Sequence, residues 1–377
     1  MHYFLIAGEA SGDLHGSHLI RAILERDPDA TITFLGGDAM AAACGEQPLV
    51  HYREMAYMGF SEVIRNLGAV RRNLSTARRA LLAARPDALI LLDYPSFNLK
   101  VAETAYKARI PVYYYIPPKI WAWKKWRVKE IRKHVRRVFA IFPFEPEFYR
   151  ANRAEAVYVG NPSVAEVDAA LQDAEPNVDF LAKNKLRPRP LVALMPGSRK
   201  AEIRNNLKIM TRALDQFPQY RGVIVGAPGI DDSFYAECSN KLPVLRYPHA
   251  CQILTHCRAA LVTSGTATLE CALAGVPQVA LYRGGGSKIT YKVMEKVLDV
   301  KYVTLPNLIA DSAVIPELLE HLCTVDATAD ALRPLLTDTP ERAAQLEGYA
   351  RIRSILGTGD AAAATAEAIV SDLSGGK

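Results

Sequence analysis

The stretch Leu191-Val-Ala-Leu-Met-Pro-Gly-Ser-Arg199, with Glu202 three residues further on, decides how the second half of the chain folds. The stretch Ala259-Ala-Leu-Val-Thr-Ser-Gly-Thr-Ala-Thr-Leu-Glu270 has the same form. Each is a short apolar run, then a turn of small residues, then a helix-forming segment. This pattern is typical of a buried parallel strand that leads into a helix, so the two junctions predict an α/β domain.

The start of each predicted helix suits a diphosphate. The first N–H groups of a helix lack intrahelical partners and carry partial positive charge, and glycine lets a phosphate approach the backbone. The sequence contains neither GxxxxGK[ST] nor a strand-linked GxGxxG, so no standard nucleotide fingerprint supports the hypothesis. The alternative is a pair of ordinary capped strand–helix turns.

Length and composition restrict the class of protein. A chain of 377 residues is too long for one ordinary core and predicts two α/β domains. The net charge of +6 suits an anionic ligand or surface and does not require nucleic acid. The six cysteines form no CxxC pair and the eight histidines are scattered, so we expect no metal site and no disulfide framework. No signal peptide is evident, and no apolar run is close to the length of about 18 residues that a membrane span needs. Both observations favour a cytoplasmic protein.

Apolar runs alternate with helix-forming segments in both halves. Strands are predicted at 3–7, 31–35, 88–92, 112–116, 138–141 and 157–159, and again at 191–194, 222–225, 259–262 and 278–282. Proline and polar residues between 167 and 190 indicate a linker. We therefore predict Rossmann-like parallel-sheet domains at 1–166 and 191–335 that face each other across a cleft, with C-terminal helices at 336–377 that cross back to the first domain.

Carboxylates follow two of the predicted strands in the first half. They lie in Gly8-Glu-Ala-Ser-Gly-Asp13 and in Leu92-Asp-Tyr-Pro-Ser-Phe-Asn98. A helix cap explains one of these residues but not all of them, and parallel sheets place ligands at the carboxyl ends of their strands. Asp93 is a candidate general base for a hydroxyl group, and Asn98 is a candidate ligand of a sugar or phosphate oxygen.

All three tryptophans lie in the stretch Lys119-Ile-Trp-Ala-Trp-Lys-Lys-Trp-Arg-Val-Lys129. From Lys119 to Arg137 there are nine Lys and Arg residues and one acid. Helical spacing of apolar residues predicts a helix with one apolar and one basic face; these residues are Val128, Ile131, Val135 and Val138. Three interpretations stay open: a core-packed helix with a solvated basic face, a nucleic-acid contact, and a surface that rests on an anionic membrane.

Several segments, in the same order along the chain, resemble the lipid-A-disaccharide synthase family, whose members are membrane-associated inverting glycosyltransferases. The matching segments are Gly8–Asp13, Met58-Gly59 with Glu62-Val63, Asp93–Asn98, Trp121-Ala-Trp123 with Arg127-Val128, Phe142–Glu145, Pro196–Arg199, Ser264–Ala267 with Leu269-Glu270, and Tyr302-Val303 with Leu305–Leu308. Each segment alone is a weak signal, whereas the ordered set is highly specific.

The resemblance implies a GT-B fold and a defined reaction. The enzyme would join UDP-2,3-diacylglucosamine to 2,3-diacylglucosamine 1-phosphate (lipid X) through a β-1,6 bond and release UDP, without metal or cofactor. The resemblance implies no binding of nucleic acid. It implies that the enzyme rests peripherally on the cytoplasmic side of the inner membrane of a Gram-negative cell. A homodimer is one assembly that fits.

The resemblance also implies roles for particular residues. Asp93 is the expected general base, with Glu9 as the alternative. Acceptor-binding residues would be Ser11, Gly12, Asp13, Asn98 and Trp123. UDP-binding residues would be Gly197, Ser198, Arg199, Glu202, Ser264, Gly265, Thr266, Ala267, Glu270 and Asn307.

The chain departs from the family pattern at two places. Ser96 stands where the family has a carboxylate, and Gly284-Gly-Gly-Ser287 replaces a bulkier stretch. Two other functions compete with the transferase: another GT-B enzyme of UDP-N-acetylglucosamine (a 2-epimerase or a peptidoglycan-type transferase), and a non-catalytic sugar-nucleotide or lipid-carrier binding protein. The carboxylates at the strand ends argue against a pure anion binder.

Overall fold

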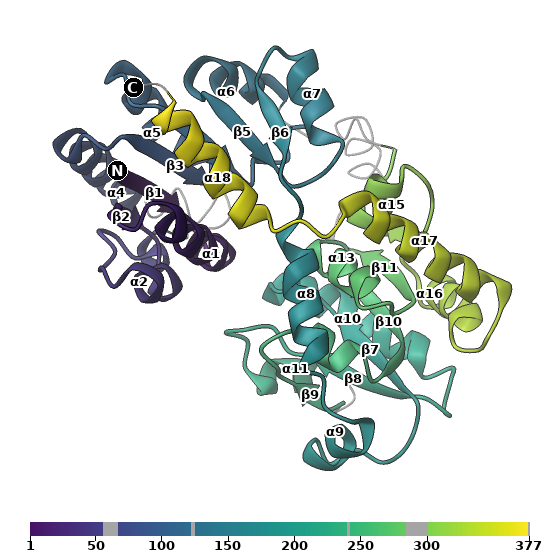
Figure 1. The fold of residues 1–377 in the computed structure, drawn as a ribbon. Coiled ribbons are helices and arrows are strands. Elements are labelled where there is room, and N and C mark those ends of the chain that lie inside the picture. Colours follow the sequence, from purple (N-terminus) through teal and green to yellow (C-terminus); the bar gives the residue numbers. More distant parts are fainter. Residues whose placement is uncertain (56–66, 122–124, 240–241, 284–300, 376–377) are drawn as a thin grey trace. The chain divides into compact units, whose positions relative to one another are not determined.

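A computed structural model describes residues 1–55, 67–121, 125–239, 242–283 and 301–375. The chain divides into two compact units, one of Met1–Pro162 with Thr358–Lys377 and the other of Ser163–Gly357. Each unit is built on a six-stranded sheet in which all pairs of strands are parallel (Figure 1). The predicted α/β class is confirmed.

The sheet of the first unit has the order β2-β1-β3-β4-β5-β6. Its strands are β1 (His2–Ala7), β2 (Thr31–Leu35), β3 (Ala88–Leu92), β4 (Val112–Tyr115), β5 (Arg137–Ala140) and β6 (Ala156–Tyr158). Its helices are α1 (Ala10–Arg26), α2 (Asp38–Cys44), α4 (Leu67–Ala84), α5 (Pro95–Lys107), α6 (Val128–His134), α7 (Glu145–Ala151) and α18 (Ala361–Ser374), with 3-10 turns η1 (Tyr52–Glu54) and η2 (Lys125–Arg127).

Both faces of this sheet are buried. Successive side chains of a strand point to opposite faces, so Phe4 and Ile6 pack in one apolar cluster while Tyr3 and Leu5 pack in another. The C-terminal helix α18 completes the second cluster with Ala361, Ala362, Ala366 and Ile369 (Figure 1). The chain therefore ends in the unit in which it begins.

The sheet of the second unit has the order β12-β11-β10-β7-β8-β9. Its strands are β7 (Leu191–Met195), β8 (Arg221–Val225), β9 (Val244–Leu245), β10 (Cys257–Thr263), β11 (Gln278–Tyr282) and β12 (Glu317–Leu319). Its helices are α8 (Pro162–Gln172), α9 (Asn177–Lys183), α10 (Lys200–Leu214), α11 (Asp232–Cys238), α12 (Cys251–Leu254), α13 (Thr266–Leu273), α15 (Leu305–Ala310), α16 (Val325–Leu332) and α17 (Pro340–Leu356), with 3-10 turns η3 (Glu320–Leu322) and η4 (Arg333–Leu335).

The segment 167–190, predicted as a linker, contains the end of α8 and all of α9. Phe180 of α9 is fully buried and packs with Leu191 and Val223 of the second sheet. The segment is thus part of the second unit, and its polar composition reflects the exposed faces of two short helices. The sequence also missed β9 and β12, which are short strands at the two edges of the sheet.

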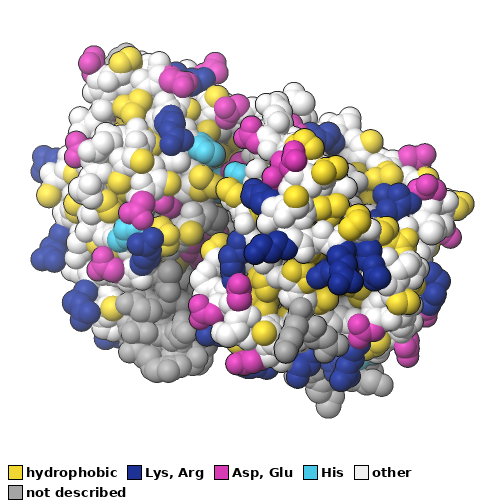
Figure 2. All heavy atoms as spheres, turned by 90° about the horizontal axis from the view of Figure 1, so that it is seen from below, with side chains coloured by type: hydrophobic (Ala, Val, Ile, Leu, Met, Phe, Trp, Pro, Cys, Tyr) yellow, Lys and Arg dark blue, Asp and Glu magenta, His cyan; other side chains and the backbone are white. Residues whose placement is uncertain are grey.

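Charge is spread over the surface. Figure 2 shows Lys and Arg side chains gathered in places on one face, with acidic side chains scattered among them. Among the described residues, no helix combines the length and the apolar character needed to cross a bilayer.

Candidate functional site

The order of strands in the second unit indicates the candidate ligand site. The chain runs outward through β7, β8 and β9, returns to the other side of β7 with β10, and continues outward through β11 and β12. The direction of winding therefore reverses between β7 and β10. In open parallel sheets ligands bind at such a switch point, beyond the carboxyl ends of the strands. Both predicted strand–helix junctions lie there.

A cavity of about 660 Å³ opens at this switch point. It is lined by the turns that follow β7 and β10, by the starts of α10 and α13, and by the ends of β8 and β9. Of the residues predicted to bind UDP, nine line it: Gly197, Ser198, Arg199, Glu202, Ser264, Gly265, Thr266, Ala267 and Glu270. The structure thus brings together two stretches that are more than sixty residues apart in the sequence.

The turn before α10 depends on Gly197. Its φ of +110° favours glycine, and a Cβ there would lie 2.6 Å from Oε2 of Glu202. Glu202 accepts a hydrogen bond from the Ser198 N–H (3.3 Å) and forms an ion pair with Arg199 (3.0 Å). Glu202 thus holds both the turn and Arg199, whose side chain is 63% exposed.

The turn before α13 offers a second set of backbone donors. Gly265 is the N-cap residue of α13, and Thr268 closes the first turn by donating from Oγ1 to the Gly265 carbonyl (2.7 Å). Glu270 lies one turn into the helix, and burial, with a smaller effect of Glu166, raises the pKa of its carboxyl group. A half-buried carboxylate beside two helix starts is suited to accept hydrogen bonds from sugar hydroxyls.

The opposite wall of the cavity contains residues that the sequence did not predict. Arg246 donates to the carbonyls of Ala227 (2.8 Å) and Ile230 (2.5 Å) and so holds the segment after β8. Tyr247 donates its hydroxyl to Glu175 (2.6 Å) and accepts from Asn184 (2.8 Å). The supposed linker therefore supports this wall. The only local signal was the small-residue turn Gly226-Ala-Pro-Gly229 after a strand.

Asn307 does not line this cavity. Its side chain is 1% exposed, and its Oδ1 accepts from the N–H groups of Val314 and Ile315 (2.8 and 2.9 Å). Its Nδ2 donates to the Ile315 carbonyl and to Glu317 (both 2.9 Å). The hydrogen-bonding groups of Asn307 thus hold the segment between α15 and β12, and its role in UDP binding stays a prediction.

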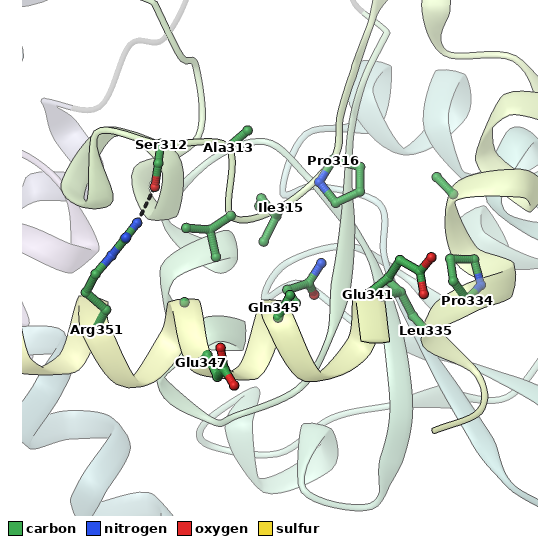
Figure 3. Close-up of a pocket in the computed structure, with 14 residues that line it drawn as sticks. Ser312, Ala313, Ile315, Pro316, Pro334, Leu335, Glu341, Gln345, Glu347 and Arg351 are labelled. Atoms are coloured by element: carbon green, nitrogen blue, oxygen red, sulfur yellow. Dashed lines mark hydrogen bonds between the residues drawn. The ribbon is translucent and has the colours of Figure 1, made fainter. Parts of the chain in front are cut away.

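A larger cavity of about 780 Å³ lies against α17 (Figure 3). Its polar residues are committed to the fold: Arg351 bonds to Ser312, and Gln345 accepts from the Gln278 N–H (2.6 Å). It lies away from the carboxyl ends of β7 and β10, and Glu341 and Glu347 on its wall disfavour an anion. The smaller cavity is therefore the candidate nucleotide site.

The first unit has its own switch point, between β1 and β3, since β2 and β3 lie on opposite sides of β1. Asp93 directly follows β3 there. Asp93 and Tyr94 both have positive φ values, 41° and 46°. Asn98 holds this backbone by donating to the carbonyls of Leu92 (3.0 Å) and Asp93 (2.7 Å), and Tyr114 also donates to the Asp93 carbonyl (2.5 Å). Strain that neighbours maintain in this way is common at functional sites.

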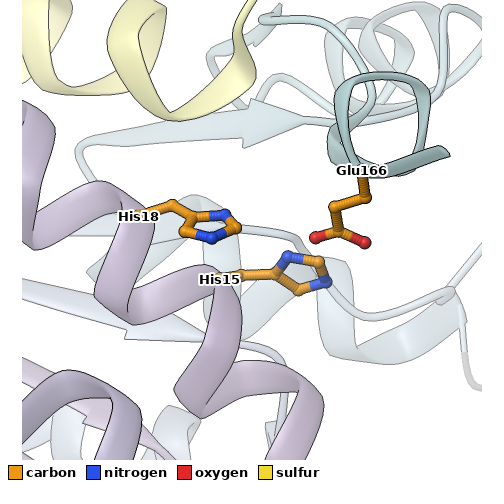
Figure 4. Close-up of side chains that lie close together, drawn as sticks. All are labelled: His15, His18 and Glu166. Atoms are coloured by element: carbon orange, nitrogen blue, oxygen red, sulfur yellow. The ribbon is translucent and has the colours of Figure 1, made fainter. Parts of the chain in front are cut away.

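The surroundings of Asp93 tune its carboxyl group. Burial raises the pKa of Asp93, whereas the Tyr94 N–H and the charges of Lys119 and His15 lower it. His15 and His18, three residues apart, project from one side of α1 (Figure 4). A half-buried carboxylate with a raised pKa is a suitable general base. The sequence analysis did not single out Lys119 or His15 at this site.

The other site residues predicted in this unit differ in burial and in what they contact. Glu9 is half-buried and Ser11 is exposed, next to the switch point. Gly12 packs α1 against Ala7 of β1. The carboxylate of Asp13 accepts from the N–H groups of Gly37, Ala39 and Met40 (2.7, 3.0 and 3.1 Å) and caps α2. Its role as an acceptor ligand stays a prediction.

Asn98 is 0% exposed and also acts through the fold, and Trp123 and Gly284–Ser287 lie outside the described residues. Ser96, the departure from the family pattern, accepts a hydrogen bond from Arg127 (2.9 Å).

The tryptophan-rich stretch divides into a buried and an exposed part. Val128 and Ile131 of α6 lie in the core, while Trp126 is 62% exposed. The helix ends at His134, and Val138 belongs to β5, so the predicted apolar helical face is shorter than expected. Trp121 is 8% exposed and does not belong to a membrane-facing surface.

The fold defines the class of protein. A solved UDP-GlcNAc 2-epimerase from Neisseria meningitidis, bound to UDP-GlcNAc, is similar with a TM-score of 0.65 at 12% identity, over 98% of this chain and 100% of that chain. The calicheamicin glycosyltransferase CalG4 is similar with a TM-score of 0.59 at 16% identity, over 99% and 98%. At such identities the likeness shows the fold alone, which is GT-B.

The sequence comparisons identify the family within this class. The family described as lipid-A-disaccharide synthetase matches residues 3–367. The lipid-A-disaccharide synthase of Myxococcus xanthus is 37% identical over 99% of this chain and 98% of that protein, and the enzyme of Geobacter metallireducens is 35% identical over 94% and 93%. This chain belongs to the lipid-A-disaccharide synthase family and is a glycosyltransferase with sugar-nucleotide and lipid substrates. The other two functions considered from the sequence are not favoured.

Proposed function

We propose that this chain transfers the 2,3-diacylglucosaminyl group of its UDP derivative to the 6-hydroxyl of 2,3-diacylglucosamine 1-phosphate. The observation that carries the proposal is family membership along nearly the whole chain. A half-buried carboxyl group at one switch point and a cavity beside two helix starts at the other support it. The products are the β-1,6-linked disaccharide 1-phosphate and UDP.

The step is a single displacement at the anomeric carbon. The acceptor oxygen forms a bond to this carbon as the bond from the carbon to the diphosphate oxygen breaks, which inverts the configuration. The hydroxyl proton passes to the Asp93 carboxylate, and the bonding electrons leave with UDP. The strained and hydrogen-bonded backbone at Asp93 supports this role because it fixes the main chain that carries the carboxylate before the substrate arrives.

The cavity of the second unit supports binding of the leaving group. The N–H groups at the starts of α10 and α13 and the guanidinium of Arg199 stabilise the negative charge that develops on the diphosphate. Glu270 is placed to accept from the ribose hydroxyls. Beyond the helix starts, Ala227, Tyr247 and Pro248 offer backbone groups and apolar surface to the uracil ring.

Peripheral contact with an anionic membrane belongs to the same proposal. The exposed Trp126 lies among exposed cations of η2 and α6: Lys125, Lys129, Arg132 and Lys133. Interfacial tryptophan combined with Lys and Arg is suited to a surface of anionic lipid.

Incubation with both acylated sugars tests the function. We expect release of UDP that depends on lipid X, and a product whose mass equals the sum of the two diacylglucosamine units with one phosphate. UDP release without lipid X would indicate a hydrolase, and conversion of UDP-GlcNAc to its C2 epimer would support the epimerase. A protein that binds UDP but transforms neither substrate would be a binding protein.

A further inference from the structure

A buried carboxylate that the transfer step does not use lies at the same sheet edge as Asp93. Glu145 is 0% exposed and is the first residue of α7, shortly after β5. Strands β3, β4 and β5 are neighbours in the sheet. Asp93 follows β3, Lys119 and Trp121 follow β4, and Glu145 follows β5, so the three segments meet at adjacent strand ends.

Both oxygens of Glu145 accept hydrogen bonds. Oε1 accepts from Nε1 of Trp121 (3.0 Å), and Oε2 accepts from the N–H groups of Ile141 (3.1 Å) and Phe142 (3.0 Å). The Trp121 ring also meets the edge of the Phe144 ring, with centroids 4.9 Å apart. Glu145 therefore ties the segment after β4 to the segment after β5 and fixes the indole of Trp121.

A cation, Lys119, lies in the same segment as the fixed indole. Lys119 precedes Trp121 by two residues, and its ammonium group lies 5.8 Å from the centroid of the Phe142 ring. The charge of Lys119 lowers the pKa of Asp93 and also that of Glu145. The charge of Lys119 thus acts on two carboxyl groups, one of which is the proposed base.

Folding alone does not favour this arrangement. Burial raises the pKa of Glu145 to about 7, which means that the ionised carboxylate is costly at this position despite its three donors. Apolar residues of similar volume often fill such a site at no loss of stability.

We infer that Glu145 is a positioning residue: it anchors Trp121, and thereby keeps the segment that carries Lys119 beside Asp93. This inference rests on the proposed function. The ionised form of Asp93 is the one that accepts the proton, and Lys119 favours it together with His15 and the Tyr94 N–H. A misplaced Lys119 leaves Asp93 less readily ionised, which is an effect on the base rather than on folding.

The test compares Trp121→Phe, which removes the Nε1 donor and keeps an aromatic ring, with Lys119→Met. Glu147→Gln, which changes an exposed carboxylate of the same helix, is the control. In Trp121→Phe we expect kcat/KM for lipid X to fall by up to about 10²-fold, as small displacements at a reacting centre do. The acid limb of its pH profile should move to higher pH, in the same direction as in Lys119→Met, while the Kd for UDP stays at the parent value.

The outcomes separate the inference from the function. If Lys119→Met moves the acid limb and Trp121→Phe does not, Glu145 does not act through Trp121 and the inference is wrong. Trp121→Phe could instead lose activity together with a lower Tm while it keeps the parent pH profile. The hydrogen bond between Trp121 and Glu145 would then serve stability alone, and the inference would be wrong. If the parent itself releases no UDP in response to lipid X, the proposed function fails, and the inference with it.

Discussion

Replacement of Glu145 by glutamine should change how the stability of the first unit depends on pH. The pKa of Glu145 is raised from an ordinary 4.5 to about 7, chiefly because burial disfavours the charged form. Between these values the unfolded chain releases a proton that the folded chain retains, so the free energy of unfolding falls as the pH rises. One pKa unit corresponds to about 1.4 kcal/mol, which gives a total of about 3 kcal/mol.

The sign follows from the raised pKa. The contribution of Glu145 is fully present below pH 4.5, decreases through the interval up to pH 7, and is absent above it. Glutamine does not titrate, so Glu145→Gln loses this dependence. The difference in stability between the parent and Glu145→Gln should therefore move by about 3 kcal/mol in favour of the variant as the pH rises from 4.5 to 7.

Urea denaturation followed by tryptophan fluorescence measures this difference. All three tryptophans of the chain, Trp121, Trp123 and Trp126, lie in the unit that contains Glu145, so the signal reports the unfolding of that unit. Glu147→Gln on the exposed side of α7 controls for the loss of a carboxylate. Parallel curves for the parent and Glu145→Gln from pH 4.5 to 8 would refute the reasoning, because they would mean that burial does not keep this carboxyl group protonated.

Four further predictions concern the site and the surface. Asp93→Asn should lower turnover by about 10²–10⁴-fold and leave the Kd for UDP unchanged, with Asp29→Asn on the surface as control; near-normal turnover would transfer the role of base to Glu9. Arg199→Ala should weaken UDP binding by roughly 10- to 100-fold in calorimetry, since a charge-assisted bond to phosphate contributes about 1.5–3 kcal/mol. Arg212→Ala at the other end of α10 is the control. Equal affinities of the two variants for UDP would remove Arg199 from the site. Activity should persist in excess EDTA, because backbone N–H groups and an arginine stabilise the diphosphate; loss of turnover that a divalent ion restores would contradict this. The triple variant Trp126→Ser, Lys125→Glu and Lys129→Glu should release the protein from anionic vesicles, because each cation lost weakens membrane binding by about 1 kcal/mol. The control, Lys208→Glu with Arg212→Glu, makes the same change in charge on α10. Equal co-sedimentation of both variants would place the membrane contact elsewhere.

The sequence by itself determined the strands, the class of fold and the family. The apolar run Ala88–Leu92 became a strand with the same bounds, because a strand buried on both faces leaves a continuous apolar signal. Thr31–Leu35 also became a strand with the predicted bounds, although it lies at the edge of the sheet and its first residue is exposed. The two junctions at Gly197 and Gly265 were recognised for a similar reason: a strand, a turn and a helix start are all coded by neighbouring residues. Nine of the ten residues expected at the nucleotide site line one cavity.

Only the tertiary structure decided what lies opposite these junctions. Tyr247 is held by Glu175, which is 72 positions away, and no local pattern marks such a pair. The same holds for three polar residues whose side chains proved to be committed to the backbone: Asp13 caps α2, Asn98 holds the turn at Asp93, and Asn307 holds the segment before β12.

The basic stretch shows the same division. Its composition suggested one amphipathic surface, but packing buried Trp121 on Glu145 and left Trp126 in solvent. Periodicity reports which residues are apolar, whereas the partner of a polar atom depends on which segments the sheet order brings together. Buried polar atoms must find such partners, so the fold as a whole, and not the local sequence, assigns them.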